Sequence, residues 1–154
     1  MLSPAVALLR KIVRGLLAAD APPQLAAGFT LGMILGLVPK GNLIAVSLCV
    51  LLFSLRVNKG LALVAAVLFS FVSPWADAFS HKLGLVVLSA GSLQTVYASV
   101  FSLPLGPWIG FNNSVVTGSL LLGLYCSYPA YWVVRTCCAW LKPVSGESVC
   151  GAAP

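Results

Sequence analysis

The chain has 154 residues, of which 60% are hydrophobic and only 8% are charged, and its formal net charge is +6. A water-soluble globular domain carries about a quarter of its residues as Asp, Glu, Lys or Arg, so this chain has too few charges to cover a surface in water. The composition excludes an ordinary soluble domain and predicts an integral membrane protein, whose cations mark topology and contact lipid headgroups rather than nucleic acid.

Residues 1–20 form the first predicted element, an amphipathic helix. Its aliphatic residues fall on one half of a helical wheel, and Arg10, Lys11 and Arg14 fall on the other half. A secretory signal peptide places its charges before an uninterrupted apolar core, whereas this segment interleaves them. We expect a helix that lies in the cytoplasmic membrane interface; a helix that binds a protein partner is the alternative.

Residues 21–140 are predicted to form a single helical membrane domain, followed by a mobile tail over residues 141–154. The domain contains apolar segments at residues 24–38, 43–55, 61–72, 83–103 and 115–134. Crossing the bilayer takes about 20 helical residues, so the last two segments are long enough and the first three are too short. Short apolar helices that end in proline or glycine beside a charge are typical of re-entrant or broken helices.

The distribution of cations predicts how these segments cross the membrane. Lys and Arg lie before the first segment, in the turn around residues 56–59, after the third segment at Lys82 and after the last segment, whereas the loop at 103–113 has none. The positive-inside rule then places both termini in the cytoplasm and this loop outside. The predicted fold is an all-α, polytopic membrane protein with two short re-entrant hairpins, tipped at residues 38–42 and 73–77, and about two full transmembrane helices. Ordinary tilted spans throughout are the alternative.

Three glycines with a spacing of four lie within the first apolar segment. Gly28, Gly32 and Gly36 share one face of a helix, where their lack of a side chain lets another backbone approach closely. We expect this face to pack against another helix, either within the chain or in a partner. The glycines are not a nucleotide-binding loop, because such a loop requires a preceding strand.

Polar residues at the predicted hairpin tips and in the basic turn are the candidate site. A charge at membrane depth is costly and is usually paired or faces water, so Lys40 and Asp77 are expected to meet if the two tips face each other. Solvation of both tips among the headgroups is the alternative. The proposed polar groove for a lipid headgroup consists of Lys40, Asn42, Arg56, Asn58, Lys59, Asp77 and His81.

The sequence offers little that could carry out catalysis. Asp77 and His81 are four residues apart and share a helix face, but two ligands do not make a metal site, and no second cluster exists in the sequence. With three acidic residues in all, the chain has neither a nucleophile and base arrangement nor paired carboxylates. We expect no catalytic, metal or cofactor site, and therefore a protein that is not an enzyme.

Residues 26–43, A-A-G-F-T-L-G-M-I-L-G-L-V-P-K-G-N-L, resemble the opening helix and Pro-x-Gly break of the bacterial membrane family known as domain of unknown function 2062. The resemblance extends over residues 20–90. It continues through Leu55-Arg-Val-Asn58, and it departs from the family at Lys40 and at Ser73, where asparagine is more usual. The Ser-Pro-Trp-Ala-Asp form at residues 73–77 is similar to a small subgroup encoded beside a large periplasmic protein of the AsmA-like, bridge-type lipid-transfer kind.

The resemblance implies a bacterial inner-membrane location and no particular chemistry. Together with the polar-tipped hairpins, it leads us to expect a subunit that associates with a larger, membrane-anchored envelope protein, such as one of the AsmA-like kind, and assists phospholipid transfer. A small transporter or channel that self-associates, with a mid-plane site formed by broken helices, is the alternative. A purely structural anchor is a third interpretation.

Overall fold

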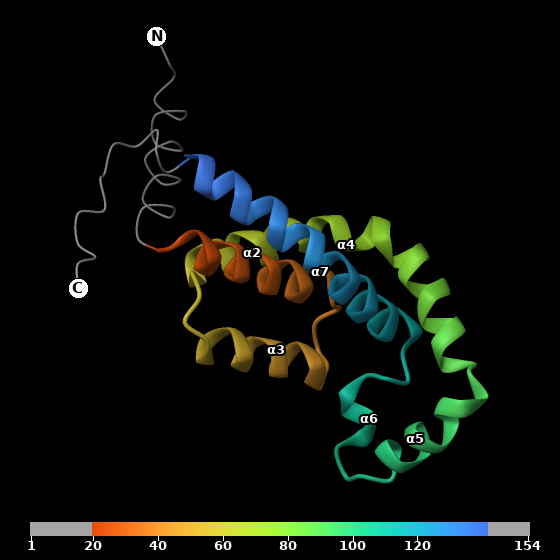
Figure 1. Cartoon of the computed structure of the whole chain (residues 1–154). Coiled ribbons are helices and arrows are strands. Elements are labelled where there is room, and N and C mark those ends of the chain that lie inside the picture. The colour runs from red at the N-terminus through yellow and green to blue at the C-terminus, as the bar shows by residue number, and fades with distance from the viewer. Residues whose placement is uncertain (1–19, 142–154) are drawn as a thin grey trace.

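The computed structural model describes residues 20–141, and nearly all of the predicted amphipathic helix and of the predicted tail lies outside this range. The helices are α2 (Pro22–Leu37), α3 (Leu43–Ser54), α4 (Lys59–Leu88), α5 (Gly91–Phe101), α6 (Gly106–Ile109) and α7 (Ser114–Leu141) (Figure 1). Residues 20–141 contain no strand, which confirms the all-α prediction for this part of the chain.

Helices α2, α4 and α7 pack on one another and form the core, while α3 touches them at few points (Figure 1). Buried apolar side chains gather where the C-terminal half of α2 meets α7 and the start of α3. These side chains belong to Met33, Ile34, Leu37, Val38, Ala45 and Val116. The remaining apolar side chains mostly face outwards, so the three packed helices have an apolar exterior.

The glycine face of α2 lies directly against the backbone of α4. A Cβ atom at Gly28 would stand 2.5 Å from the carbonyl oxygen of Asn58, and one at Gly32 would overlap the carbonyl oxygen of Ala62. Gly36 repeats the pattern at Ala66, so every glycine meets a residue thirty positions later in the chain. A constant offset of this kind means that α2 and α4 run parallel.

A second close crossing joins α4 to α7 through small residues that the sequence analysis did not single out. A Cβ atom at Gly84 would overlap the carbonyl oxygen of Ser114, and one at Gly118 would overlap that of Ser80. Here the residue numbers rise on one helix as they fall on the other, so α7 runs antiparallel to α4. Both crossings use small residues four apart, which is the pattern that brings helix backbones together in membranes.

The predicted second hairpin, with a tip at residues 73–77, is wrong. Helix α4 continues without interruption through Pro74 and changes direction along its length (Figure 1). A proline inside a helix removes one backbone donor and bends the helix without ending it when neighbouring groups satisfy the freed carbonyls. The adjacent Ser73 hydroxyl donates to the carbonyl of Leu37 at 3.0 Å, which ties this part of α4 to the end of α2.

The predicted transmembrane segment at residues 83–103 is also wrong. Its first six residues are the end of α4, the chain turns at Ser89 and Ala90, and α5 then begins at Gly91. None of the side chains of α5 is buried. Within the described residues, α4 is the one helix that is long and apolar enough to cross a membrane, judged by length and composition.

Candidate functional site at the turn between α2 and α3

The turn between α2 and α3 corresponds to the predicted first hairpin tip at residues 38–42. Gly41 has a φ angle of 96°, a backbone conformation that side chains disfavour, so glycine suits this position. Asn42 then caps α3, since its Oδ1 accepts from the backbone nitrogen of Ala45 at 2.8 Å and its Nδ2 donates to the carbonyl of Pro39 at 2.6 Å. The turn is therefore held by its own side chains.

Lys40 anchors this turn to α4. Its Nζ donates to the carbonyl oxygen of Gly36 and to the hydroxyl oxygen of Ser70, each at 2.8 Å. Both partners are neutral, and in the part of the chain that the structure covers no carboxylate lies within 4.0 Å of the ammonium. The predicted meeting of Lys40 with Asp77 is wrong for this reason. The positive charge of Lys40 is hydrogen-bonded but is not neutralised.

The contact with Ser70 also defines how far the turn lies along α4. Ser70 is eleven residues beyond Lys59, the first residue of α4, which places Lys40 about 17 Å along a helix about 45 Å long. Helices α2 and α3 therefore form a short hairpin that reaches less than halfway along α4 and returns.

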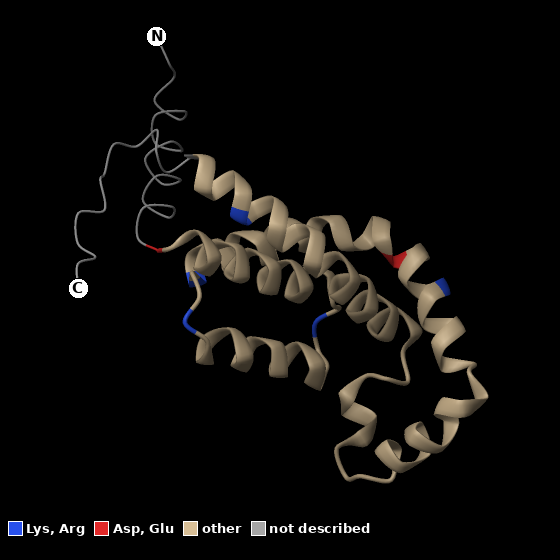
Figure 2. Ribbon diagram, viewed as in Figure 1, with Lys and Arg blue, Asp and Glu red and all other residues tan. Residues whose placement is uncertain are grey.

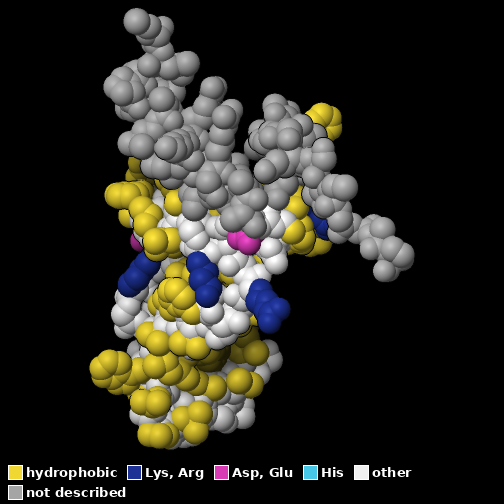
Figure 3. Space-filling view, turned by 90° about the vertical axis from the view of Figure 1, so that its left-hand side faces the viewer, with side chains coloured by type: hydrophobic (Ala, Val, Ile, Leu, Met, Phe, Trp, Pro, Cys, Tyr) yellow, Lys and Arg dark blue, Asp and Glu magenta, His cyan; other side chains and the backbone are white. Residues whose placement is uncertain are grey.

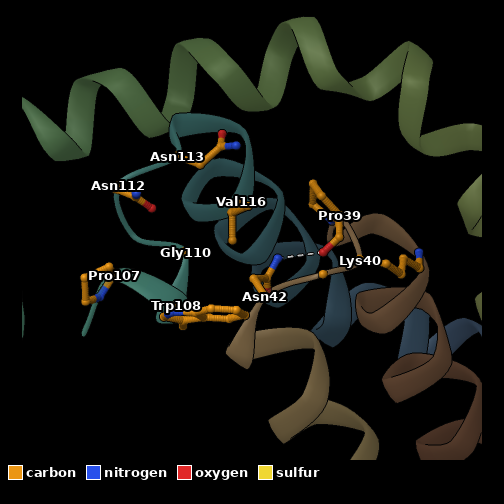
Figure 4. Close-up of a pocket in the computed structure, with 10 residues that line it drawn as sticks. Pro39, Lys40, Asn42, Pro107, Trp108, Gly110, Asn112, Asn113 and Val116 are labelled. Atoms are coloured by element: carbon orange, nitrogen blue, oxygen red, sulfur yellow. Dashed lines mark hydrogen bonds between the residues drawn. The ribbon is translucent and has the colours of Figure 1, made fainter. Parts of the chain in front are cut away.

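On one side of the turn lies a hollow of about 310 Å³, here called the turn pocket. It is bounded by residues 39–42 and by residues of α6 and the loop before α7 (Figure 4). The amides of Asn42, Asn112 and Asn113 and the indole of Trp108 surround it, whereas the side chain of Lys40 points away from it (Figure 4). The pocket offers uncharged hydrogen-bonding groups beside an aromatic ring.

On the other side of the turn lies a second hollow of about 430 Å³, here called the α3–α4 groove. Its apolar lining consists of Leu35, Ala45, Val46, Cys49, Ala66 and Val67. Gly41, Lys40 and Ser70 complete the lining, and Lys40 is joined to Ser70 by a hydrogen bond. The groove is thus an apolar slot with a cation in its wall.

The basic turn between α3 and α4 lies at the opposite end of α3 from Lys40 (Figure 2). Asn58 is only 7% exposed, donates through Nδ2 to Asp20 at 2.8 Å, and accepts through Oδ1 from the backbone of Leu61 at 2.6 Å. It is therefore an internal helix cap rather than a headgroup contact. Lys59 lies over the ring of Phe53, with 5.8 Å between Nζ and the ring centroid.

Asp77 and His81 point to different partners, although they lie on the same helix. The Ser73 hydroxyl, which donates to the carbonyl of Leu37 at 3.0 Å, lies 3.3 Å from Oδ1 of Asp77, and Nδ1 of His81 lies within hydrogen-bonding distance of the Ser114 hydroxyl. The single polar groove predicted from Lys40, Asn42, Arg56, Asn58, Lys59, Asp77 and His81 is therefore wrong, because these residues occupy three separate places. Only Lys40 and Asn42 share the turn, and even they face opposite sides of it (Figure 4).

The sequence analysis missed the residues that complete both hollows. Trp108, Asn112 and Asn113 were treated as part of an outer loop, although this polar stretch between apolar elements could have suggested a second set of ligands. Ser70 has no distinguishing sequence context and is identified only by its contact with Lys40. No group of three or more His, Cys, Asp or Glu side chains within residues 20–141 is arranged to hold a metal ion.

Figure 3 shows Lys and Arg side chains on one side of the molecule. Among residues 20–141, Arg56 in the turn before α4, Lys59 at the start of α4 and Arg135 in the last turns of α7 lie near one end of the helix bundle, whereas Lys40 lies at the α2–α3 turn and Lys82 towards the other end of α4 (Figure 2). Arg135 stacks over Trp132, with 5.2 Å between its guanidinium carbon and the ring centroid. Cations beside aromatic rings are typical of the boundary between lipid and water.

Comparison with known proteins gives two matches that agree. Residues 7–143 match the model of a family described as an uncharacterised protein conserved in bacteria (DUF2062). The chain is also 34% identical, over 124 residues, to an uncharacterised protein of Treponema pallidum (strain Nichols); the match covers 80% of this chain and 76% of that protein. No solved structure matches the chain.

Proposed function

Because the chain belongs to the DUF2062 family of uncharacterised bacterial proteins, we propose a function from the geometry of its own residues. The protein is a multi-pass subunit of the bacterial inner membrane that associates with a larger envelope protein and assists the transfer of phospholipid between the membrane and that partner. The observation that carries this proposal is the unneutralised ammonium of Lys40 at the tip of a hairpin too short to cross a bilayer.

The apolar exterior of the core helices supports placement in a bilayer. Large side chains on α4 such as Phe71, Trp75 and Phe79 are more than half exposed, and Trp75 reaches 87%. Contiguous apolar surface of this kind requires lipid or another protein to cover it. The buried positions include the hydroxyl groups of Thr30, Ser80 and Ser119 among mostly apolar side chains.

The basic end of the molecule supports an orientation. With Arg56, Lys59 and Arg135 at the cytoplasmic surface, α4 crosses outwards and α7 returns. The α2–α3 hairpin then enters from the cytoplasmic side and ends near the middle of the bilayer, because its tip lies about 17 Å along α4. Both chain termini are cytoplasmic in this arrangement.

A cation at that depth would attract a phosphate group. Charged side chains within the membrane are rare, and they mark pathways or sites for ions and substrates. A short hairpin with polar groups at its tip provides a place where a headgroup can enter the hydrocarbon region without losing every polar contact. We attribute the assistance in phospholipid transfer to this effect.

Two measurements test the proposal. Single cysteines placed at Arg56 and at Asn112 should react with a membrane-impermeant maleimide from opposite sides of the inner membrane. Affinity purification of the full chain from native membranes, followed by mass spectrometry, should recover phospholipid and a larger protein with a transmembrane anchor. Labelling of both cysteines from the same side would exclude the topology, and recovery of the chain with no second protein would exclude the role as a subunit.

The turn pocket favours a second candidate, a small self-associating transporter or channel. There the α2–α3 turn meets the loop before α7, and three asparagine amides surround one hollow (Figure 4). Backbone turns that meet within a membrane protein are typical of mid-plane sites for polar solutes. The oligomeric state discriminates between the candidates, because a homo-oligomer without a second protein is expected of the transporter and not of the subunit.

A further inference from the structure

We infer that the α3–α4 groove is a binding site for one glycerophospholipid, with an acyl chain against the apolar lining and the phosphate on Lys40. This inference rests on the membrane placement given under the proposed function and deepens it by naming the site and the part of the lipid that each side binds. It selects the α3–α4 groove over the turn pocket as the lipid site.

The first argument is the chemistry of the groove wall. Apart from Lys40 and Ser70, its lining consists of aliphatic, alanine, cysteine and glycine residues, none of which offers a charged group. Val46 on α3 and Val67 on α4 are each at least half exposed, so the groove opens to the outside of the helix bundle. An apolar slot that opens sideways between two helices, in a protein surrounded by lipid, favours an acyl chain over a water-soluble ligand.

The second argument is charge complementarity at the groove. An ammonium group has three N–H donors, and two of those of Lys40 are used by the carbonyl of Gly36 and the hydroxyl of Ser70. One donor of the ammonium group therefore remains for a phosphate oxygen. Within residues 20–141 no carboxylate pairs with this cation, whose two hydrogen-bond partners are both neutral.

The third argument is that the turn pocket does not fit the same ligand. Its polar groups are asparagine amides, and Figure 4 shows the Lys40 side chain directed away from it. An uncharged pocket has no electrostatic preference for phosphate, whereas the groove has both a cation and an apolar wall. The two sides of the turn are thus chemically different, and only the groove suits an anionic amphiphile.

The test measures lipid retained by the full chain, purified in detergent, with native mass spectrometry. Phosphatidylglycerol and diacylglycerol with identical acyl chains are the two probes, since they share the apolar part and differ in the phosphate. We expect the wild type to retain phosphatidylglycerol about tenfold more than diacylglycerol, the effect of one charge-assisted hydrogen bond. Lys40→Met should abolish this preference and Lys40→Arg should keep it.

The apolar wall of the groove is tested separately, in case Lys40→Met fails to fold because the hydrogen bonds of Lys40 to Gly36 and Ser70 are lost. Val46→Trp fills the groove, whereas Val50→Trp places the same side chain one turn further along α3, outside the lining. We expect Val46→Trp to lower retention of both lipids and Val50→Trp to leave it unchanged.

Equal retention by the two tryptophan variants, or an unchanged preference in a folded Lys40→Met protein, would overturn the inference. Recovery of the envelope partner by the wild type is independent of either result, so failure of this site and failure of the proposed function are distinguishable.

Discussion

The ammonium of Lys40 lies 2.8 Å from the hydroxyl oxygen of Ser70, thirty residues later in the chain. This contact and the hydrogen bond from the Ser73 hydroxyl to the carbonyl of Leu37 hold the tip of the α2–α3 hairpin at a defined level of α4. The contact with Ser70 also keeps the lysine side chain on the side of the α3–α4 groove and leaves Asn42 on the other side. The position of the cation is therefore a property of the packing of α2 on α4, and not of the turn alone.

A double-mutant cycle should detect this contact. Ser70→Ala removes one of the two acceptors of Lys40, and we expect it to lower the free energy of unfolding in detergent by about 1 kcal/mol. In a Lys40→Met background the same substitution should cost less, because the hydrogen bond is already gone. Ser99→Ala on α5 is the control, since its hydroxyl bonds only within its own helix, to the carbonyl of Thr95. Strict additivity of the two substitutions would show that the side chains do not interact.

The parallel packing of α2 on α4 predicts that Gly32→Ala is poorly tolerated. The added methyl group would overlap the carbonyl oxygen of Ala62, so the two helices must separate, at a cost of about 1–3 kcal/mol. Gly123→Ala is a matched change inside α7, where the nearest atoms lie at an ordinary 3.4 Å. Thermal unfolding in detergent should show a lower midpoint for the first variant and little change for the second. Equal midpoints would mean that the glycine face is not in close contact.

The continuity of α4 through Pro74 predicts a helical pattern of lipid exposure. Spin labels placed one at a time over residues 67–80 should show the greatest oxygen accessibility near Phe71 and Trp75, and the least at Ser80. The accessibility should repeat about every 3.6 residues on both sides of the proline. A run of water-accessible positions at residues 73–77, measured with a polar relaxation agent, would contradict the continuous helix and support the predicted hairpin tip there.

The buried amide of Asn58 predicts that this position is structural. Asn58→Ala removes the cap at the start of α4 and the hydrogen bond to Asp20, which should cost about 1–2 kcal/mol of stability. Asn58→Asp keeps the acceptor for Leu61 but brings a second carboxylate against Asp20, so it should also destabilise the protein. Arg56→Ala, at an exposed position in the same turn, should have little effect on unfolding. An unchanged stability of the Asn58→Ala protein would show that this amide does not stabilise the start of α4.

The first hairpin was predictable because prolines precede its first helix at residues 22–23, and Pro39 and Gly41 mark its turn. The apolar segment expected at residues 24–38 is α2 at Pro22–Leu37, and the one expected at 43–55 is α3 at Leu43–Ser54. The spacing of the glycines in α2 also led to the expectation of a close helix contact, and the backbone of α4 lies there. These features depend on neighbouring residues in the chain, which the sequence displays directly.

The errors concern residues whose role depends on distant parts of the chain. Pro74 can end a helix or bend one, and the choice depends on whether neighbouring groups such as the Ser73 hydroxyl find partners across the interface. Asn58 has the same sequence features whether it caps a helix internally or faces a headgroup. The α3–α4 groove arises where two helices fail to close against each other, and no local pattern encodes that gap.

The constant offset of thirty residues between α2 and α4 also governs the length of α3. Since the two helices run parallel, the chain must return from the level of Ser70 to the level of Asn58 before α4 can begin. That distance is twelve residues of helix, about 18 Å, and α3 has 12 residues. Removal or addition of a single turn in α3 would shift the glycines of α2 out of register with the residues of α4 that they contact. We therefore expect α3 to tolerate neither insertions nor deletions, although α3 itself makes few contacts with the other helices.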